Sequence, residues 1–282
     1  MDKPHDSLIF IGGSQRSGST ILQKLICTAN ECHPMIGECW FLLHQLSAYQ
    51  NQINNYDVLL EDYFGRRENF DQFTRNILSR FFDETRKNLS NPHTLVMRHP
   101  GITTQFPILG SWFENARFII NIRDPRDTIA SIVKVNEQHK REGVKSGQSR
   151  LGRDMNLLTQ YFKRNYLNTF DINSPIRDRT LFVRYESLMK DVSKECAKIA
   201  GFCSLSFDDN KINSLGQVKT NTPHMNPDIR KKEHSGAAFW SDLYSEDLST
   251  TRIGKHKEIL TSNEILQIQM LCNDFNKVFP YW

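Results

Sequence analysis

The residues best suited to chemistry begin with a glycine-rich turn near the N-terminus. An apolar stretch from Leu8 to Ile11 leads into Gly12-Gly13-Ser14-Gln15-Arg16-Ser17-Gly18-Ser19-Thr20, and a helical pattern follows. Glycines let the backbone turn tightly with its N–H groups pointing inward, and a helix start adds unpaired donors and partial positive charge. The arrangement predicts a binding site for a phosphate-like anion.

This loop differs from that of a P-loop kinase or NTPase. Gly13 and Gly18 have Walker A spacing and Thr20 keeps the final hydroxyl, but Ser19 stands where that motif has lysine. Those enzymes use the lysine on the phosphates and an acidic strand end to hold Mg²⁺, and neither is evident. The loop carries its cation at Arg16 instead. A Mg²⁺-dependent kinase is therefore disfavoured and stays as an alternative of another class.

A second basic position follows an apolar stretch in the middle of the chain. Residues 118–122 lead into Arg123-Asp124-Pro125-Arg126-Asp127, and Ser131 lies eight residues after Arg123. The apolar run predicts a buried strand that delivers Arg123 to the carboxyl edge of a sheet, and Pro125 suits a helix first turn. Arg123 can fork onto phosphate oxygens and Ser131 can donate its hydroxyl. The competing interpretation of Arg123 is a surface ion pair with Asp124 or Asp127.

Together these segments resemble the sulfotransferases that use 3′-phosphoadenosine 5′-phosphosulfate (PAPS). Their 5′-phosphosulfate loop looks like residues 13–20, and their 3′-phosphate motif looks like residues 123–127 with Ser131. Residues 183–188 resemble the family's Arg-Tyr-Glu-Asp-Leu strand end, and residues 252–257 resemble its C-terminal basic segment. The resemblance runs from residue 8 to about 260. It implies PAPS as sulfuryl donor, adenosine 3′,5′-bisphosphate (PAP) as product and no required metal.

The resemblance also implies which residues bind the nucleotide. They are Gly13, Ser14, Gln15, Arg16, Ser17, Gly18, Ser19, Thr20, Arg123, Ser131, Tyr185, Arg252 and Lys255. Sulfuryl transfer further needs a cation for the departing phosphate and a base for the acceptor's proton. By analogy Arg16 is the first such cation.

Two residues compete for the role of general base. Glu38 follows Gly37 about twenty residues after the loop. Tyrosylprotein-type sulfotransferases have a similar Gly-Glu pair, and its glutamate acts as the general base. Cytosolic sulfotransferases instead use a histidine close to a strand end, and a catalytic lysine precedes that histidine. This chain has Arg98 where the lysine is expected, and His99 directly after it. Because neighbouring strand residues point to opposite faces, we expect only one of these two in the site. We favour Arg98 as leaving-group cation and Glu38 as base, with His99 as the alternative.

The acceptor that fits this interpretation is a small metabolite with a hydroxyl or amino group. The Gly37-Glu38 pair makes peptidyl tyrosine the second choice. A non-catalytic nucleotide-binding module, which would bind the nucleotide without turnover, is a further alternative.

Alternating apolar strands and amphipathic helices must position these residues, and they predict an α/β fold with a mainly parallel sheet flanked by helices. We expect one P-loop-like sulfotransferase domain over residues 1–282. Strands are expected at residues 8–11, 35–36, 94–97, 118–122 and 181–183. Helices are expected from residue 18, within 39–89, and over 126–135, 157–170, 188–200 and 262–278. Residues 136–153 read as a polar surface connection, and residues 203–251 as an irregular lid.

Composition limits the partners and the compartment. The chain has 282 residues with 36 Lys and Arg against 32 Asp and Glu, a net charge of +4 that suits a small anion and predicts no nucleic-acid binding. No apolar run approaches the ~18 residues of a membrane span, and the first strand begins too early for a signal peptide. The six cysteines lack metal-ligand spacing. We therefore expect a cytoplasmic protein with reduced thiols, no membrane contact and a small-molecule acceptor.

Overall fold

A sheet of parallel strands lies at the centre of the computed structural model, which describes residues 7–143, 149–166, 174–213, 215 and 249–282. Within these residues the sheet has four strands in the order β2-β1-β3-β4. They are β1 (Ser7–Gly13), β2 (Thr94–Arg98), β3 (Ala116–Ile122) and β4 (Thr180–Arg184). All neighbouring pairs are parallel, so the expected fold class is confirmed.

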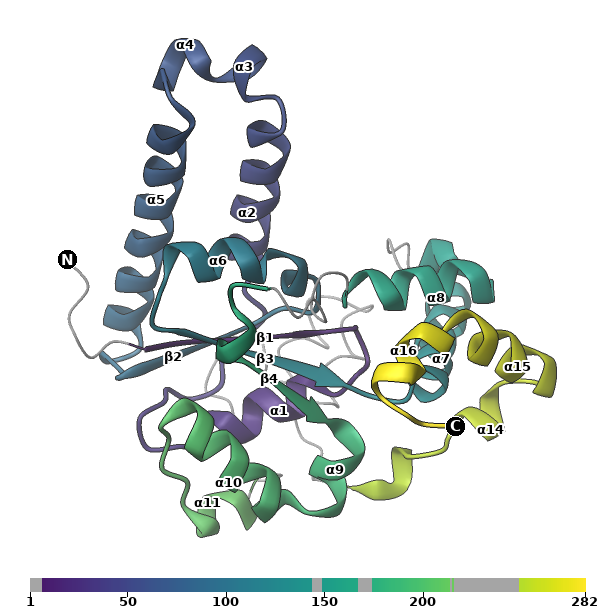
Figure 1. Cartoon of the computed structure of the whole chain (residues 1–282). Coiled ribbons are helices and arrows are strands. Elements are labelled where there is room, and N and C mark those ends of the chain that lie inside the picture. The colour runs from purple at the N-terminus through teal and green to yellow at the C-terminus, as the bar shows by residue number, and fades with distance from the viewer. Residues whose placement is uncertain (1–6, 144–148, 167–173, 214, 216–248) are drawn as a thin grey trace.

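Helices cover both faces of the sheet (Figure 1). One face carries α1 (Ser19–Ile26), α9 (Tyr185–Lys190), α10 (Val192–Cys203) and α11 (Asp209–Asn213). The other carries α6 (Phe106–Trp112) and a long hairpin of α2 (Trp40–Ile53) and α5 (Arg67–Asn88), which α3 (Tyr56–Leu59) and α4 (Glu61–Phe64) join. No helix in the described ranges is both long and apolar enough to cross a bilayer.

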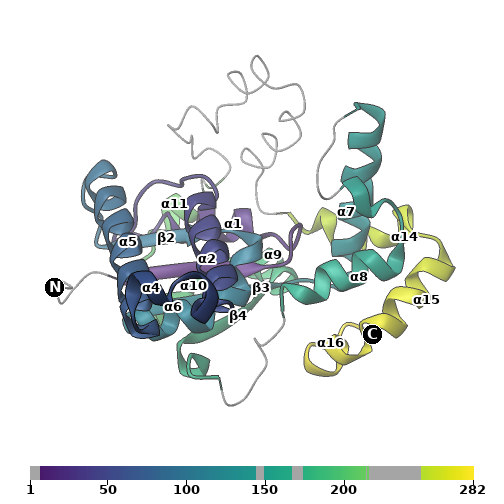
Figure 2. The ribbon, with the colours of Figure 1, turned by 90° about the horizontal axis from the view of Figure 1, so that it is seen from above.

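A third group of helices lies beyond the carboxyl ends of the strands (Figures 1 and 2). It contains α7 (Pro125–Arg141), α8 (Met155–Arg164), α14 (His256–Ile259), α15 (Ser262–Leu271) and α16 (Asn273–Val278). Short 3₁₀ turns, η1 (Pro100–Gln105), η2 (Ser149–Leu151), η3 (Arg177–Arg179) and η6 (Thr250–Arg252), complete the described elements. This group therefore brings the C-terminal part of the chain to the edge where β1 and β3 end.

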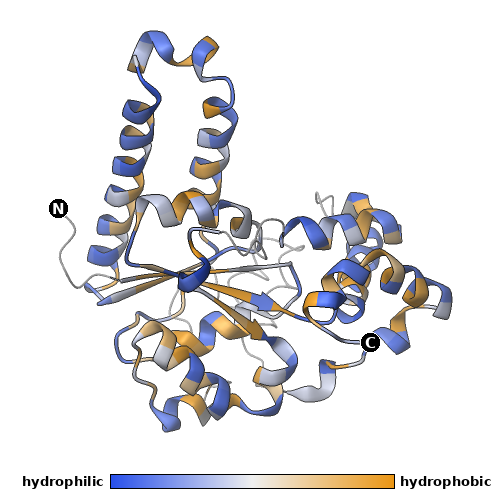
Figure 3. Cartoon of the chain, viewed as in Figure 1, coloured by the Kyte–Doolittle hydropathy of each residue, from blue (hydrophilic) through white to orange (hydrophobic). Residues whose placement is uncertain are grey.

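The core consists of two apolar layers that the sheet separates, since successive strand residues face opposite sides. Phe10 and Phe118 stack with ring centroids 5.7 Å apart in the layer under α2, α5 and α6. Ile9, Ile11 and Val183 belong to the layer under α1 and α10. Figure 3 shows β4 largely hydrophobic and the helices mixed, as expected for elements with one buried face.

The strand order creates, at the carboxyl end of β1, the kind of position at which open α/β sheets bind ligands. From β1 the chain moves to β2 on one side and then returns to β3 on the other, which creates a topological switch point. Gly13 at the end of β1 lies level with Asn121 of β3, and Arg98 of β2 lies level with Ile11. The loops after the three strands therefore meet at one edge.

Several expected elements differ in the structure. Residues 35–36 form no strand, because the Ile36 carbonyl accepts a hydrogen bond from the Gln23 side chain of α1 at 3.2 Å instead of pairing in a ladder. Helix α7 runs on to Arg141, into the stretch expected as a connection. The expected helix over 188–200 is divided at Asp191, which caps α10 through the Lys194 N–H. The helix over 262–278 is divided at Cys272.

The expected lid over residues 203–251 falls mostly on positions 216–248, outside the described residues. The same holds for residues 167–170 at the end of the expected helix over 157–170.

Gly18 is one of the glycines that the geometry of the first loop requires. Its φ is 99°, and a Cβ there would lie 2.4 Å from a ring atom of Tyr185. We therefore expect Gly18→Ala to lower the free energy of unfolding by about 2–4 kcal/mol, from left-handed strain and overpacking together. Gly201→Ala is the control: it lies in α10 with open space around it, and alanine should add about 0.5–1 kcal/mol. Urea unfolding measures both, and equal stability of the two variants would contradict this account.

Candidate functional site

The loop between β1 and α1 presents backbone N–H donors at the carboxyl edge of the sheet. Gly13 and Arg16 have φ values of 120° and 66°, and Gly18 precedes the first turn of α1. No side chain caps α1, so the first-turn N–H groups have no intrahelical or side-chain acceptor. The Ser17 hydroxyl donates to the Ser14 carbonyl at 2.7 Å, which closes the loop on itself. This leaves a helix N-terminus with positive partial charge directed at the carboxyl edge of the sheet.

Buried side chains from other elements hold the loop in place. The Gly13 N–H donates to Thr103 Oγ1 at 2.7 Å, and the Asn121 amide donates to the Ser17 carbonyl. The Ser14 N–H donates to the Tyr166 hydroxyl at 3.1 Å, which itself donates to the Asn121 carbonyl at 3.1 Å. Burial raises the pKa of Tyr166 well above its usual value, so the hydroxyl keeps its proton. None of Thr103, Asn121 and Tyr166 was assigned a role from the sequence.

Arg98 forms the centre of a first cationic group. Its side chain is 1% exposed. Nε donates to Gln23 Oε1 at 2.8 Å, and Nη1 donates to Glu38 Oε1 at 2.9 Å. The Cys39 N–H donates to the Arg98 carbonyl at 3.0 Å, which holds the Glu38 segment against the end of β2. Gln23, on the buried face of α1, links Arg98 to the Ile36 carbonyl, and the only sequence signal for it is a polar residue within an apolar stripe.

His99 reaches the same carboxylate. Its Nε2 lies 3.9 Å from Glu38 Oε2, and its ring packs edge-on against Trp40 at a centroid distance of 4.4 Å. We expected only one of Arg98 and His99 at the site, but both approach Glu38. The reason is that His99 lies just beyond the end of β2, where η1 begins and strand alternation no longer applies.

The protonation of His99 follows from its surroundings. Its Nδ1 accepts the Gly101 N–H at 3.0 Å, so in the neutral ring the proton is on Nε2. Burial lowers the pKa of His99 from 6.5 to about 4, against an opposing effect of Glu38. The imidazole is therefore neutral near pH 7, with Nε2–H as a donor.

Arg123 forms the centre of a second cationic group. Nη1 donates to the Arg16 carbonyl at 3.1 Å and Nη2 to the Arg252 carbonyl at 2.6 Å, and the guanidinium lies 4.4 Å above the centroid of the Tyr185 ring. Arg16 Nε donates to Ser131 Oγ at 3.1 Å. Arg123 is 6% exposed and its Nη2 lies 4.0 Å from Asp127 Oδ2, so the ion pair considered as an alternative is present with Asp127, but it is buried and not at the surface. The loop, the second basic position and Tyr185 are thus brought together.

Some sequence-selected residues lie apart from these groups. Lys255 is exposed and its Nζ pairs with Glu258 at 2.7 Å. Thr20 is half-buried in the first turn of α1, where its side chain makes no described hydrogen bond. Within the described residues, no three His, Cys, Asp or Glu side chains gather as a metal site. All six cysteines are unpaired.

Unsatisfied buried atoms test whether the site fits a nucleotide that carries charge at two ends. Within the described residues, the buried side-chain atoms without a hydrogen-bond partner include Ser14 Oγ, Gln15 Oε1 and Asn121 Oδ1 at the loop, and Arg98 Nη2 and Arg123 Nε in the two arginine groups. Buried polar atoms are normally satisfied; the serine hydroxyl and the two guanidinium nitrogens can donate to an anion, whereas the two amide oxygens cannot. Two groups of donors flank one phosphate loop, and they fit a ligand with two separate anionic ends.

The lowered pKa of His99 predicts a specific acid sensitivity. As the pH falls below 6.5 the unfolded chain takes up a proton that the folded state binds only near pH 4, so the stability contribution present above 6.5 is lost. Between pH 7 and pH 5 this loss is about 2 kcal/mol. We expect His99→Asn, whose amide oxygen can still accept the Gly101 N–H, to be less destabilised over this range by about that amount.

Urea unfolding of the wild type and the variant at both pH values measures this difference. Exposed His44→Asn is the control, and it should follow the wild type. Identical acid losses in the wild type and His99→Asn would show that His99 does not titrate at a lowered pKa.

Comparison with known proteins shows which family the chain belongs to. A sequence profile of the sulfotransferase family matches residues 8–209, which include the loop, Glu38, Arg98 and Arg123. No curated protein matches the chain.

Three solved structures share the fold. The sulfotransferase domain from the curacin biosynthetic pathway aligns with a TM-score of 0.54 and 19% identity over 95% of this chain and 98% of that one. The sulfotransferase domain of the Synechococcus PCC 7002 olefin synthase gives 0.51 and 17% over 100% and 98%. A sulfotransferase of Mycobacterium avium gives 0.51 and 14% over 100% and 79%. The fold agrees with these structures, and the profile match over most of its length shows that the chain belongs to the sulfotransferase family.

Proposed function

We propose that this sulfotransferase uses PAPS and transfers the sulfuryl group to a hydroxyl or amino group of a small metabolite. The observation that carries the proposal is the pair of buried arginine groups on either side of one phosphate loop, each with an unfilled donor. PAPS has anionic groups at its 5′ and 3′ positions and supplies an activated sulfuryl group. A site for a nucleotide with phosphates at only one end would need a single group.

The two groups divide the recognition of the nucleotide. The loop residues 13–20 and the start of α1 bind the 5′-phosphosulfate, while Arg123 and Ser131 bind the 3′-phosphate. Arg16 links both ends, because its backbone belongs to the loop and its side chain contacts Ser131. The Tyr185 ring packs against the Arg123 guanidinium. Arg252 lies on the 3′ side, where its carbonyl accepts from Arg123, whereas Lys255 has to leave its pair with Glu258 to reach the 3′-phosphate. Recognition needs no metal, because the arginines supply the positive charge.

Glu38 is the general base. Its carboxylate is 25% exposed, so an acceptor can reach it, and Oε1 is held by Arg98 while Oε2 accepts the acceptor's proton. His99 is less suited to this role, because Nδ1 already accepts the Gly101 N–H and Nε2 carries the proton. His99 instead places its neutral ring beside the carboxylate, with Nε2 3.9 Å from Glu38 Oε2, and packs against Trp40.

Arg98 stabilises the departing phosphate. The acceptor oxygen or nitrogen forms a bond to sulfur, the bond from sulfur to the phosphate oxygen breaks, and charge builds on that oxygen. Arg98 Nη2 has no partner among the described residues, and its other two nitrogens are fixed by Gln23 and Glu38. A preorganised donor of this kind lowers the barrier without reorganisation during the reaction.

The unpaired cysteines fit a reducing compartment, for which we propose the cytoplasm.

Calorimetry with PAP and with adenosine 5′-monophosphate (AMP), both in excess EDTA, tests the nucleotide. We expect PAP to bind well without Mg²⁺ and AMP to bind much more weakly. Arg123→Ala should weaken PAP binding by ~2–4 kcal/mol, because a buried guanidinium on a phosphate is lost. Arg117→Ala is the control, since Arg117 lies at the opposite end of β3. Loss of PAP binding when EDTA removes Mg²⁺, or equal affinity for PAP and AMP, would favour the alternative of a P-loop kinase.

Replacement of Glu38 tests the catalytic assignment. Glu38→Gln keeps the size of the side chain and removes the proton acceptor, so turnover should fall ~10²–10⁴-fold with PAP affinity nearly unchanged. Labelled PAPS is offered with a panel of hydroxyl compounds, amines and a tyrosine peptide, and PAP release is followed. His99→Asn is compared in parallel. If His99→Asn is inactive while Glu38→Gln turns over normally, the base is His99, and preference for the tyrosine peptide would replace the small-molecule acceptor.

A further inference from the structure

We infer that Asp127 is a positioning residue for 3′-phosphate recognition, because it fixes the C-terminal basic segment (residues 252–257) against Arg123. This inference rests on the proposed function. Asp127 lies in the first turn of α7 and is 2% exposed. No part of the proposed chemistry uses it, yet it is among the most buried carboxylates at the site.

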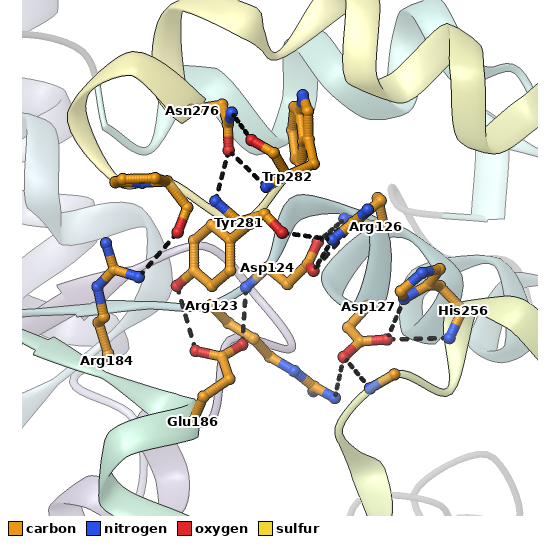
Figure 4. A network of polar contacts seen from close by, with 12 residues as sticks. Arg123, Asp124, Arg126, Asp127, Arg184, Glu186, His256, Asn276, Tyr281 and Trp282 are labelled. Carbon is orange, nitrogen blue, oxygen red and sulfur yellow. Dashed lines mark hydrogen bonds and ion pairs between the residues drawn. The ribbon is translucent and has the colours of Figure 1, made fainter.

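The Asp127 carboxylate collects three hydrogen bonds from the C-terminal basic segment (Figure 4). Oδ2 accepts the Gly254 N–H at 2.7 Å. Oδ1 accepts the His256 N–H at 2.9 Å and His256 Nδ1 at 2.7 Å. The partners lie 127 and 129 residues further along the chain. The segment that carries Arg252 and Lys255 is therefore held by one side chain from the first turn of α7.

Arg123 completes the arrangement. Its Nη2 lies 4.0 Å from Asp127 Oδ2 and donates to the Arg252 carbonyl at 2.6 Å. Asp127, Arg123 and the C-terminal basic segment thus form a closed ring of contacts. Displacement of the segment would remove the Arg252 carbonyl from Arg123 Nη2 and leave the guanidinium held by the Arg16 carbonyl and the Tyr185 ring.

The charge of Asp127 matters as well as its shape. Burial alone would raise the pKa of Asp127, but hydrogen bonds from His256 and Gly254 and the nearby Arg123 together lower it. A carboxylate can accept all three donors at once, whereas an amide at this position would turn an N–H toward at least one of them. Asn at position 127 therefore keeps the volume and breaks the ring of contacts.

Asp124 provides a matched control from the same turn. It caps α7 through the Arg126 N–H at 2.8 Å and pairs with the Arg126 side chain at 2.7 Å. Figure 4 shows this pair directed toward Tyr281 and Trp282, away from the C-terminal basic segment. Asn at position 124 can still cap the helix. Asp124→Asn thus removes one negative charge near Arg123 and leaves the contacts of Asp127 intact.

The test compares PAP and AMP binding by calorimetry in the full chain. In Asp127→Asn we expect PAP affinity to fall about tenfold or more, in line with loss of charge-assisted hydrogen bonds, and AMP affinity to change less than about twofold. Asp124→Asn should keep both affinities. His256→Leu should lose part of the PAP affinity, and His256→Asn, whose amide can replace Nδ1 as donor, should restore it. A purely structural role would weaken PAP and AMP equally.

The outcomes separate this inference from the proposed function. If the wild type binds PAP no better than AMP, the proposed function fails. If the wild type prefers PAP and Asp127→Asn keeps that preference, the inference on Asp127 is overturned. If circular dichroism shows that Asp127→Asn does not fold, the two His256 variants decide. Equal preference for PAP over AMP in His256→Leu and His256→Asn overturns the inference on Asp127. A preference that is lost in His256→Leu and restored in His256→Asn supports it.

Discussion

The rest of the structure depends on two buried guanidiniums, those of Arg98 and Arg123. Taking a charge out of water costs several kcal/mol unless partners replace the lost hydration. Arg98 has one carboxylate at 2.9 Å and Arg123 has one at 4.0 Å. Neither arginine has all its donors filled within the described residues. The surrounding scaffold must therefore hold both cations in place so that an incoming anion can complete their coordination.

The fold meets this requirement by ending three parallel strands at one edge. Arg98 ends β2, the phosphate loop follows β1, and Arg123 follows β3, so the cations arrive on rigid elements with the loop between them. Side chains distant in the sequence then lock each cation: Gln23 holds Arg98, and Asp127 holds the segment that contacts Arg123. Such preorganisation removes the entropy cost of assembling donors when the nucleotide binds.

The sequence alone was sufficient for those parts of the structure that local patterns encode. The strands that end at the phosphate loop and at Arg123 were visible as apolar runs before glycine or arginine, and the parallel sheet followed from their alternation with helices. Both arginine positions were identified from their places after these strands. The strand expected at residues 35–36 was wrong, because the buried Gln23 amide takes the hydrogen bond of Ile36.

Contacts between distant segments could not be read from local patterns. Tyr166 supports the phosphate loop across 152 residues, and Asp127 holds Gly254 across 127 residues. Asp127 and its partners Gly254 and His256 each lay inside a recognised segment, but nothing in the local patterns showed that these two segments are in contact. The approach of both Arg98 and His99 to Glu38 was also missed, because alternation of faces ceases where β2 ends.

A crystal structure of the chain with PAP bound tests the central claim most directly, namely that two cationic groups on either side of one loop recognise the two charged ends of the nucleotide. The account predicts the 5′-phosphate on the backbone N–H groups of residues 15–20 and the 3′-phosphate against Arg123 and Ser131. It also predicts Arg98 Nη2 directed at the space beyond the 5′-phosphate, next to Glu38. A 3′-phosphate in solvent, with Arg123 still bonded only to the carbonyls of Arg16 and Arg252, would contradict it.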